Sequence, residues 1–153
     1  MVQPGAQKPV ILLVEDSDED LGLIRRALAD ADLGYLVRFV RSGERAISYL
    51  KGDGEYANRM HYPLPNLLLL DLKMPGTSGL EVLQWVRSQP KLRFLPVVVL
   101  TGTDEIREAN QAYKLGANSF MVKPLDFENC QAMSAWLRNY WLNGPSHFHL
   151  PAS

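Results

Sequence analysis

The sequence lacks the features that mark secreted, membrane-spanning and nucleic-acid-binding chains. Its single cysteine, Cys130, cannot form an internal disulfide, and its first residues hold no apolar core of a signal peptide. No apolar run approaches the roughly 20 residues that span a bilayer. The net charge is -1, so no basic field favours nucleic acid or an anionic membrane. We therefore expect a cytoplasmic protein that binds neither nucleic acid nor a membrane.

Nucleotide binding has no motif support either. The chain has no Gly-x-x-x-x-Gly-Lys loop and no Gly-x-Gly-x-x-Gly after a predicted strand. No internal repeat or low-complexity linker divides its 153 residues, which suit one domain. We expect a flexible lead over residues 1–8, a domain over residues 9–142 and a tail over residues 143–153, which is too short for a DNA-binding domain.

Short apolar runs alternate with segments of helical spacing. The runs predict buried strands at residues 10–14, 35–40, 67–70, 96–100 and 119–122. Helices are expected after Ser17, from residue 42 to 50, from about residue 80 to 89, from 104 to 115 and from 126 to 142. This alternation predicts an α/β fold, a single doubly wound (βα)5 domain with a flavodoxin-like parallel five-stranded sheet of order 2-1-3-4-5.

Polar side chains follow most of these strands. Glu15 and Asp16 end the first, Asp71 the third, Thr101 the fourth and Lys123 the fifth. In the predicted strand order the first and third strands are neighbours, so Asp16 should face Asp71. Crowded carboxylates repel, and Mg²⁺ would relieve that repulsion while keeping positions for phosphate oxygens. The set suits phosphoryl transfer to a carboxylate nucleophile, with the metal and Lys123 neutralising the phosphoryl charge.

These segments resemble the receiver domain of two-component response regulators over about residues 10–142. The segments are Val14-Glu15-Asp16, Leu70-Asp71-Leu72-Lys73-Met74-Pro75-Gly76, Leu100-Thr101-Gly102-Thr103 and Phe120-Met121-Val122-Lys123-Pro124. The resemblance implies that Asp71 is the phospho-acceptor. It also implies that Asp16 and Asp71 bind Mg²⁺ directly, that Glu15 holds a metal-bound water and that the backbone carbonyl of Lys73 completes the protein ligands.

The same resemblance implies a conformational switch. Thr101 would be the hydroxyl that moves onto the phosphoryl group, and Phe120 the aromatic side chain that follows it inward. Lys123 would contact a phosphoryl oxygen, and the Lys123–Pro124 bond would be cis, which is otherwise a minority state for proline. Two positions depart from the commonest pattern of the family: the acid pair is Glu15-Asp16 rather than Asp-Asp, and Lys73 stands where uncharged or acidic side chains are frequent. Lys73 and Thr103 leave the lifetime of the phosphorylated state open.

A narrower resemblance concerns the partner. The loop segment Gly52-Asp53-Gly54-Glu55-Tyr56 and the Trp/Tyr-rich final helix are similar to small regulators that act with bacterial phytochrome kinases. The expected protein is a single-domain response regulator that receives its phosphoryl group from a sensor histidine kinase, here a bacteriophytochrome. It would not be an enzyme beyond catalysing its own phosphorylation and dephosphorylation.

Two alternatives remain at this point. An aspartyl-nucleophile, Mg²⁺-dependent phosphatase of the haloacid-dehalogenase kind needs a second Asp two residues after the nucleophile, where this chain has Lys73. A degenerate receiver that acts only as a binding module would not need Asp16, Asp71, Thr101 and Lys123 together.

Helical geometry gives expectations for the acids of the first helix and the aromatics of the last helix. Asp18, Glu19 and Asp20 are expected to serve the helix N-terminus, where the helix dipole favours them. Trp136 is expected on a solvated face beside Tyr140, about 120° from the core stripe. This face and Phe148 of the tail predict a homodimer; the alternative is that the tail folds back over Trp136 within one chain.

Overall fold

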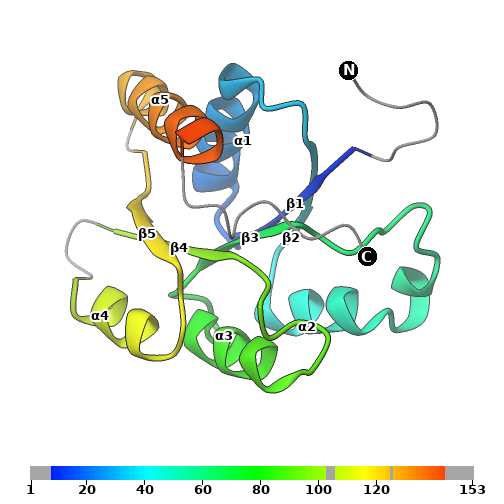
Figure 1. Ribbon diagram of the computed structural model, residues 1–153. Coiled ribbons are helices and arrows are strands. Elements are labelled where there is room, and N and C mark those ends of the chain that lie inside the picture. The colour runs from blue at the N-terminus through cyan, green and yellow to red at the C-terminus, as the bar shows by residue number, and fades with distance from the viewer. Residues whose placement is uncertain (1–7, 103–105, 125, 144–153) are drawn as a thin grey trace.

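The fold is a parallel sheet between two layers of helices (Figure 1). The computed structural model describes residues 8–102, 106–124 and 126–143. The strands are β1 (Val10–Val14), β2 (Leu36–Val40), β3 (Leu67–Asp71), β4 (Val97–Thr101) and β5 (Ser119–Val122). The helices are α1 (Asp18–Ala31), α2 (Gly43–Lys51), the 3₁₀ helix η1 (Gly54–Ala57), α3 (Gly79–Ser88), α4 (Ile106–Lys114) and α5 (Phe127–Asn143). The sheet has the order β2-β1-β3-β4-β5 with every pairing parallel, which confirms the predicted topology.

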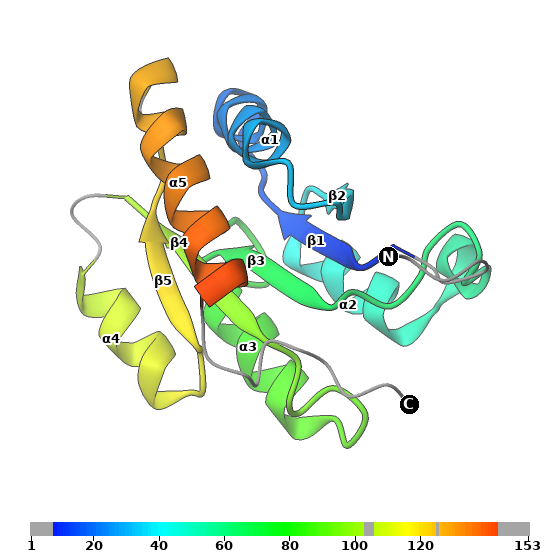
Figure 2. The same cartoon turned by 45° about the horizontal axis from the view of Figure 1, so that its top comes forward.

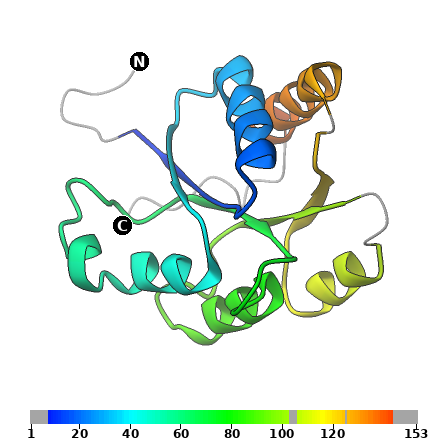
Figure 3. The same ribbon diagram turned by 180° about the vertical axis from the view of Figure 1, so that it is seen from behind.

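Both faces of the sheet are covered, which explains why its central strands are apolar at nearly every position. Helices α1 and α5 lie on one face, and α2, α3 and α4 lie on the other (Figures 1 and 3). Along β1, Leu12 and Val14 point into the core beneath α2–α4, whereas Ile11 and Leu13 point into the core beneath α1 and α5. Because successive side chains of a strand point to opposite faces, this one apolar run contributes to both cores.

Helix α1 begins where its sequence predicts. Ser17 is the N-cap, and its hydroxyl accepts the backbone N–H of Asp20 at 3.2 Å. The predicted apolar stripe is buried: Leu21, Ile24, Ala27, Leu28 and Ala31. Helix α5 lies beside α1 (Figure 2), and the hydroxyl of Ser134 donates to the carbonyl of Ala27 at 2.8 Å. The first and last helices thus close one face of the sheet together.

The long connection between α2 and β3 is more ordered than its composition suggested. Tyr49, Tyr56 and Tyr62 form a cluster with ring centroids 5.0–5.9 Å apart, and η1 carries the middle ring. The guanidinium of Arg59 donates to the carbonyls of Tyr49, Leu50 and Tyr62. Aromatic packing and one arginine replace the periodic hydrogen bonds that a helix or strand would supply.

The predicted cis bond at Lys123–Pro124 is wrong. The described residues contain no cis peptide, and this bond has the trans form that X–Pro bonds favour intrinsically. The backbone N–H of Lys123 donates to the carbonyl of Thr101 at 2.8 Å, which keeps the end of β5 beside the end of β4.

Two glycines allow the loop between β3 and α3 to pack closely. Gly76 has a φ of +75°, a left-handed conformation that favours glycine. Gly79 opens α3, and a Cβ at this position would overlap the backbone carbonyl of Asp71. The first turn of α3 therefore rests directly on the backbone of the residue that ends β3.

Gly79→Ala should lower the free energy of unfolding by about 1–3 kcal/mol, because the added methyl forces α3 away from Asp71. The matched control is Gly22→Ala in the middle of α1, where a Cβ meets nothing within 4 Å. That change should stabilise the protein by about 0.5–1 kcal/mol, because alanine favours a helix over glycine. Urea denaturation of both variants measures the difference. Equal effects of the two substitutions would contradict the close packing at Gly79.

Candidate metal and phospho-acceptor site

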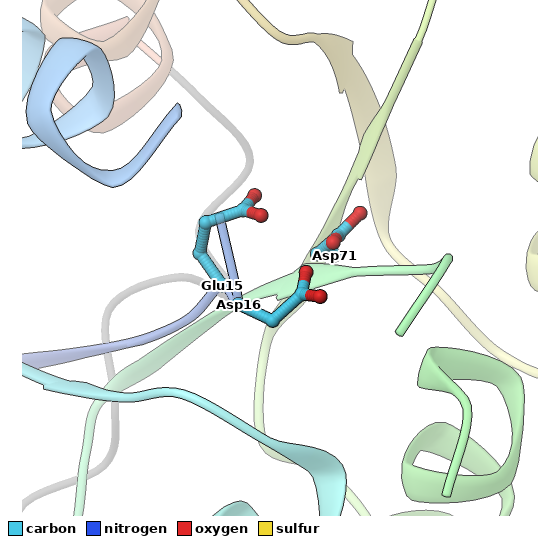
Figure 4. A group of neighbouring side chains, drawn as sticks. All are labelled: Glu15, Asp16 and Asp71. Atoms are coloured by element: carbon cyan, nitrogen blue, oxygen red, sulfur yellow. The ribbon is translucent and has the colours of Figure 1, made fainter. Parts of the chain in front are cut away.

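Three carboxylates meet at the carboxyl edge of the sheet. β1 and β3 are parallel neighbours in the register Val14 to Leu70, so the residues that follow emerge side by side. Glu15, Asp16 and Asp71 each bring a carboxylate oxygen within 4.8 Å of the others (Figure 4). The structure thus brings together the acids that the sequence placed at two separate strand ends.

Two of these acids are fully buried. Burial raises the pKa of Glu15 to about 7, and the neighbouring charge of Asp71 adds to the shift. Burial also raises the pKa of Asp71. Oδ1 of Asp71 accepts the backbone N–H of Lys73 at 3.4 Å, whereas Oδ2 accepts no hydrogen bond from the described residues. An acceptor without a donor at a buried position is costly unless a ligand satisfies it.

Lys123 is the cation of the site. Its Nζ lies 3.0 Å from Oδ1 of Asp71, 3.1 Å from Oε2 of Glu15 and 3.1 Å from Oδ2 of Asp20. Desolvation lowers the pKa of this ammonium, but the charges of Asp71 and Glu15 outweigh that effect and raise it. Lys123 therefore stays protonated and holds three carboxylates that would otherwise repel one another.

Asp20 is a residue that the sequence interpretation missed. Its backbone takes part in the N-cap of α1, as expected, but its side chain reaches Lys123 across the site. Side chains of a helix tilt toward the helix N-terminus, so a residue in the first turn of α1 points back to the end of β1. The position of Asp20 four residues after Asp16 was the available signal.

Thr101 and Phe120 come from the neighbouring parallel strands β4 and β5. Thr101 ends β4 and is buried, and its hydroxyl donates to the carbonyl of Met121 at 3.4 Å. Phe120 is 36% exposed and packs edge-on against Tyr113, with ring centroids 5.7 Å apart. Thr103 lies outside the described residues.

Glu44 is a second residue that the sequence interpretation missed. Its Oε1 accepts the backbone N–H of Thr77 at 2.6 Å, and this bond lowers the pKa of the Glu44 carboxyl. The contact joins the start of α2 to the β3–α3 loop, which also carries Lys73. Glycines on both sides, Gly43 and Gly76, leave the room that it needs.

The residues present fit a divalent cation. Glu15, Asp16 and Asp71 are hard oxygen ligands of the kind that Mg²⁺ and Mn²⁺ prefer, and Oδ2 of Asp71 has no hydrogen-bond donor among the described residues. Glu15, Asp20 and Asp71 surround the ammonium of Lys123, and Asp16 adds a fourth carboxylate to the site. A divalent ion would offset most of the remaining charge.

The expectation for Trp136 needs correction, and part of the predicted dimer surface lies outside the described residues. Trp136 is half-buried rather than solvated, because its indole reaches the core between the sheet and α1 and α5. It also lines a groove of about 440 Å³ between β5 and α5. The side chain of Tyr140 and the whole of Phe148 are not described.

Comparisons with known proteins agree with this geometry. The family model for the response regulator receiver domain matches residues 11–135. Response regulator Rcp1 of Synechocystis sp. is 35% identical over 133 residues, which cover 87% of this chain and 88% of Rcp1.

Two solved structures extend the comparison. The crystal structure of the phosphorylated cyanobacterial phytochrome response regulator RcpA is 34% identical, with a TM-score of 0.79 over 91% of this chain and 97% of the other. The crystal structure of the Mn²⁺-bound form of Rcp1 is 35% identical, with a TM-score of 0.79 over 95% of this chain and 100% of the other.

No helix among the described residues is long and apolar enough to cross a bilayer.

The fold, the acids at the ends of β1 and β3 and the match over residues 11–135 lead to one conclusion. The chain belongs to the response regulator receiver family.

Proposed function

We propose that this chain is a single-domain response regulator that accepts a phosphoryl group onto Asp71 from a sensor histidine kinase in a Mg²⁺-dependent reaction. The observation that carries the proposal is Oδ2 of Asp71, which is buried, accepts no hydrogen bond from the described residues and faces an acid pair and a lysine. In the transfer, a carboxylate oxygen of Asp71 forms the new bond to phosphorus while the bond from phosphorus to the histidine nitrogen of the kinase breaks.

Mg²⁺, when bound, supplies positive charge that neutralises the phosphoryl oxygens. Asp16 and Asp71 would bind it directly, Glu15 would hold one of its waters, and the backbone carbonyl of Lys73 would complete the protein ligands. Lys123 would contact a phosphoryl oxygen, since its ammonium already lies 3.0 Å from Asp71. The chain would catalyse only its own phosphorylation and dephosphorylation.

The proposed response to phosphorylation runs through Thr101 and Phe120. The hydroxyl of Thr101 donates weakly to Met121 at 3.4 Å, so a phosphoryl oxygen offers it a stronger, charge-assisted bond. That movement would vacate space next to β5, and Phe120, now partly exposed, would enter it. The differential contact of Thr101 would thus shift the population toward the active state.

We also propose a bacteriophytochrome as the kinase, the cytoplasm as the location and a homodimer as the assembly. Support for the kinase comes from RcpA, whose structure is described as that of a phytochrome response regulator. The dimer would use the α5 face of Trp136 together with Tyr140 and Phe148. Residues 1–8 and 143–153 would flank a receiver domain over residues 9–142.

Asp71→Asn should abolish phosphoryl labelling while the fold stays intact, because the amide keeps the shape of the side chain and removes the nucleophile. The protein is incubated with acetyl phosphate and Mg²⁺, and the acyl phosphate is counted by mass spectrometry. Asp18→Asn, an exposed acid of α1, is the control that should label like wild type. Labelling of the Asp71 variant at the wild-type level would reject the assignment. Continuous release of phosphate from many phosphoesters would point to a phosphatase instead.

Asp16→Asn should weaken Mg²⁺ binding by about tenfold or more, because a hard cation loses a charged ligand at short range. Isothermal titration calorimetry gives the affinity, and the amide resonances of Asp71 and Lys73 report the site directly. Asp18→Asn changes the net charge equally at an exposed position and should leave the affinity within about twofold. An unchanged affinity in the Asp16 variant would show that the cation binds elsewhere.

Glu15 predicts a dependence of stability on pH. Its folded pKa of about 7 exceeds its usual value of 4.5, so the folded state binds more protons between these values. The free energy of unfolding should therefore fall as pH rises from about 5 to 7.5 in metal-free buffer, by about 1–3 kcal/mol. Glu15→Gln should reduce this slope and leave the contribution of Asp71, whose pKa burial also raises, whereas Glu19→Gln on the exposed surface should keep the full slope. Urea denaturation at a series of pH values measures the slopes, and the same slope in both variants would refute the buried charge of Glu15.

A further inference from the structure

We propose that Asp20 is a positioning residue, which holds the ammonium of Lys123 in place when Glu15 and Asp71 turn to the metal ion. This inference rests on the proposed function and extends it to a residue outside the metal ligands. The contact behind it is the ion pair between Oδ2 of Asp20 and Nζ of Lys123 at 3.1 Å.

An ammonium has three N–H donors, and Lys123 has three carboxylates around it. The side chain of Lys123 is 15% exposed, and the three acids lie within 3.1 Å of its Nζ: Glu15, Asp20 and Asp71. Glu15 and Asp71 are buried and belong to the acidic group that would take a divalent ion. Asp20 is not part of that group, so its bond to Lys123 does not compete with the metal.

The position of Asp20 is fixed by the local sequence. Ser17 caps α1 by accepting the N–H of Asp20, which places this side chain in the first turn, directed to the strand ends. The neighbouring acids have other surroundings: Asp18 pairs with Arg41, and Glu19 is exposed without an ion pair in the described chain. Among the three acids of the first turn, Asp20 alone contacts Lys123 there.

Metal binding makes this contact important. A divalent ion held by Asp16 and Asp71, with Glu15 holding one of its waters, would draw the oxygens of Glu15 and Asp71 away from Lys123 and would also repel the ammonium. Lysine has a long, flexible side chain, and without a further partner it would lose its fixed position beside the acceptor. A cation that is already in place stabilises a transferring phosphoryl group better than one that must be ordered during the reaction.

Positioning of Lys123 by Asp20 should speed phosphorylation, whereas the negative charge of Asp20 should slow it, because the charge repels an anionic phosphodonor. Two substitutions separate the effects. Asp20→Asn keeps an oxygen that can accept from Lys123 and removes the charge, whereas Asp20→Ala removes both. Positioning predicts that the Asn variant retains the function of Asp20 and that the Ala variant loses it. Glu19→Ala is the matched control, because it removes a charge from the same helical turn without a contact to Lys123.

The first measurement needs no phosphorylation. The ammonium of Lys123, protected by three carboxylates, should give a slowly exchanging NH₃⁺ resonance in ¹H–¹⁵N spectra of the metal-free protein. At saturating Mg²⁺ we expect this resonance to persist in wild type, Asp20→Asn and Glu19→Ala, and to be lost through faster exchange in Asp20→Ala, where no carboxylate is left to hold the ammonium. A resonance that Mg²⁺ affects equally in Asp20→Ala and wild type would overturn the proposal.

The second measurement is the rate constant of labelling by acetyl phosphate at saturating Mg²⁺. Asp20→Ala should lower it by about tenfold, while Asp20→Asn should equal or exceed wild type. Equal rates in Asp20→Ala and wild type, or a faster Ala variant, would overturn the positioning role. Absence of labelling in wild type would reject the proposed function instead, and the NH₃⁺ resonance at saturating Mg²⁺ would still report on the contact between Asp20 and Lys123.

Discussion

The ammonium of Lys123 lies among carboxylates that reach it from β1, α1 and β3, and the site depends on this arrangement. Glu15 and Asp71 are buried at the edge of an otherwise apolar sheet, where a charge is stable only with a partner. One lysine offsets part of that charge and leaves an excess of negative charge. The same imbalance that costs stability in the metal-free protein gives a divalent cation its place.

Much of the architecture was predictable because the relevant signals are local. Uninterrupted apolar runs such as Leu67–Leu70 indicated strands that are covered on both faces, and helical spacing placed α1 with its Ser17 cap. The strand order then brought Asp16 next to Asp71. The proximity of these two residues could be predicted from the strand order alone, because residues that follow paired parallel strands leave the sheet at the same edge.

The contacts that were missed join residues far apart in sequence through side chains whose local role was already satisfied. Asp20 fits a helix N-terminus, and its place four residues after Asp16 does not point to Lys123, 103 residues later. Glu44 fits the start of α2, and its bond to Thr77 becomes visible only when the β3–α3 loop is folded over it. The tyrosine cluster around η1 has no periodicity to detect. The trans bond before Pro124 contradicts an expectation taken from family resemblance rather than from this sequence.

Asp71 is part of the sheet itself and not of a loop. Its backbone pairs with β4 opposite Leu100, the preceding Leu70 pairs with Val14 of β1, and Gly79 closes against its carbonyl. The backbone of Asp71 is therefore held from three directions and is fixed relative to its surroundings. If a phosphoryl group were attached to this side chain, the backbone of Asp71 would stay in place, and any displacement would have to occur in the elements that face it. The conformational change would then pass through the hydroxyl of Thr101 to the end of β5, while the centre of the sheet keeps its position.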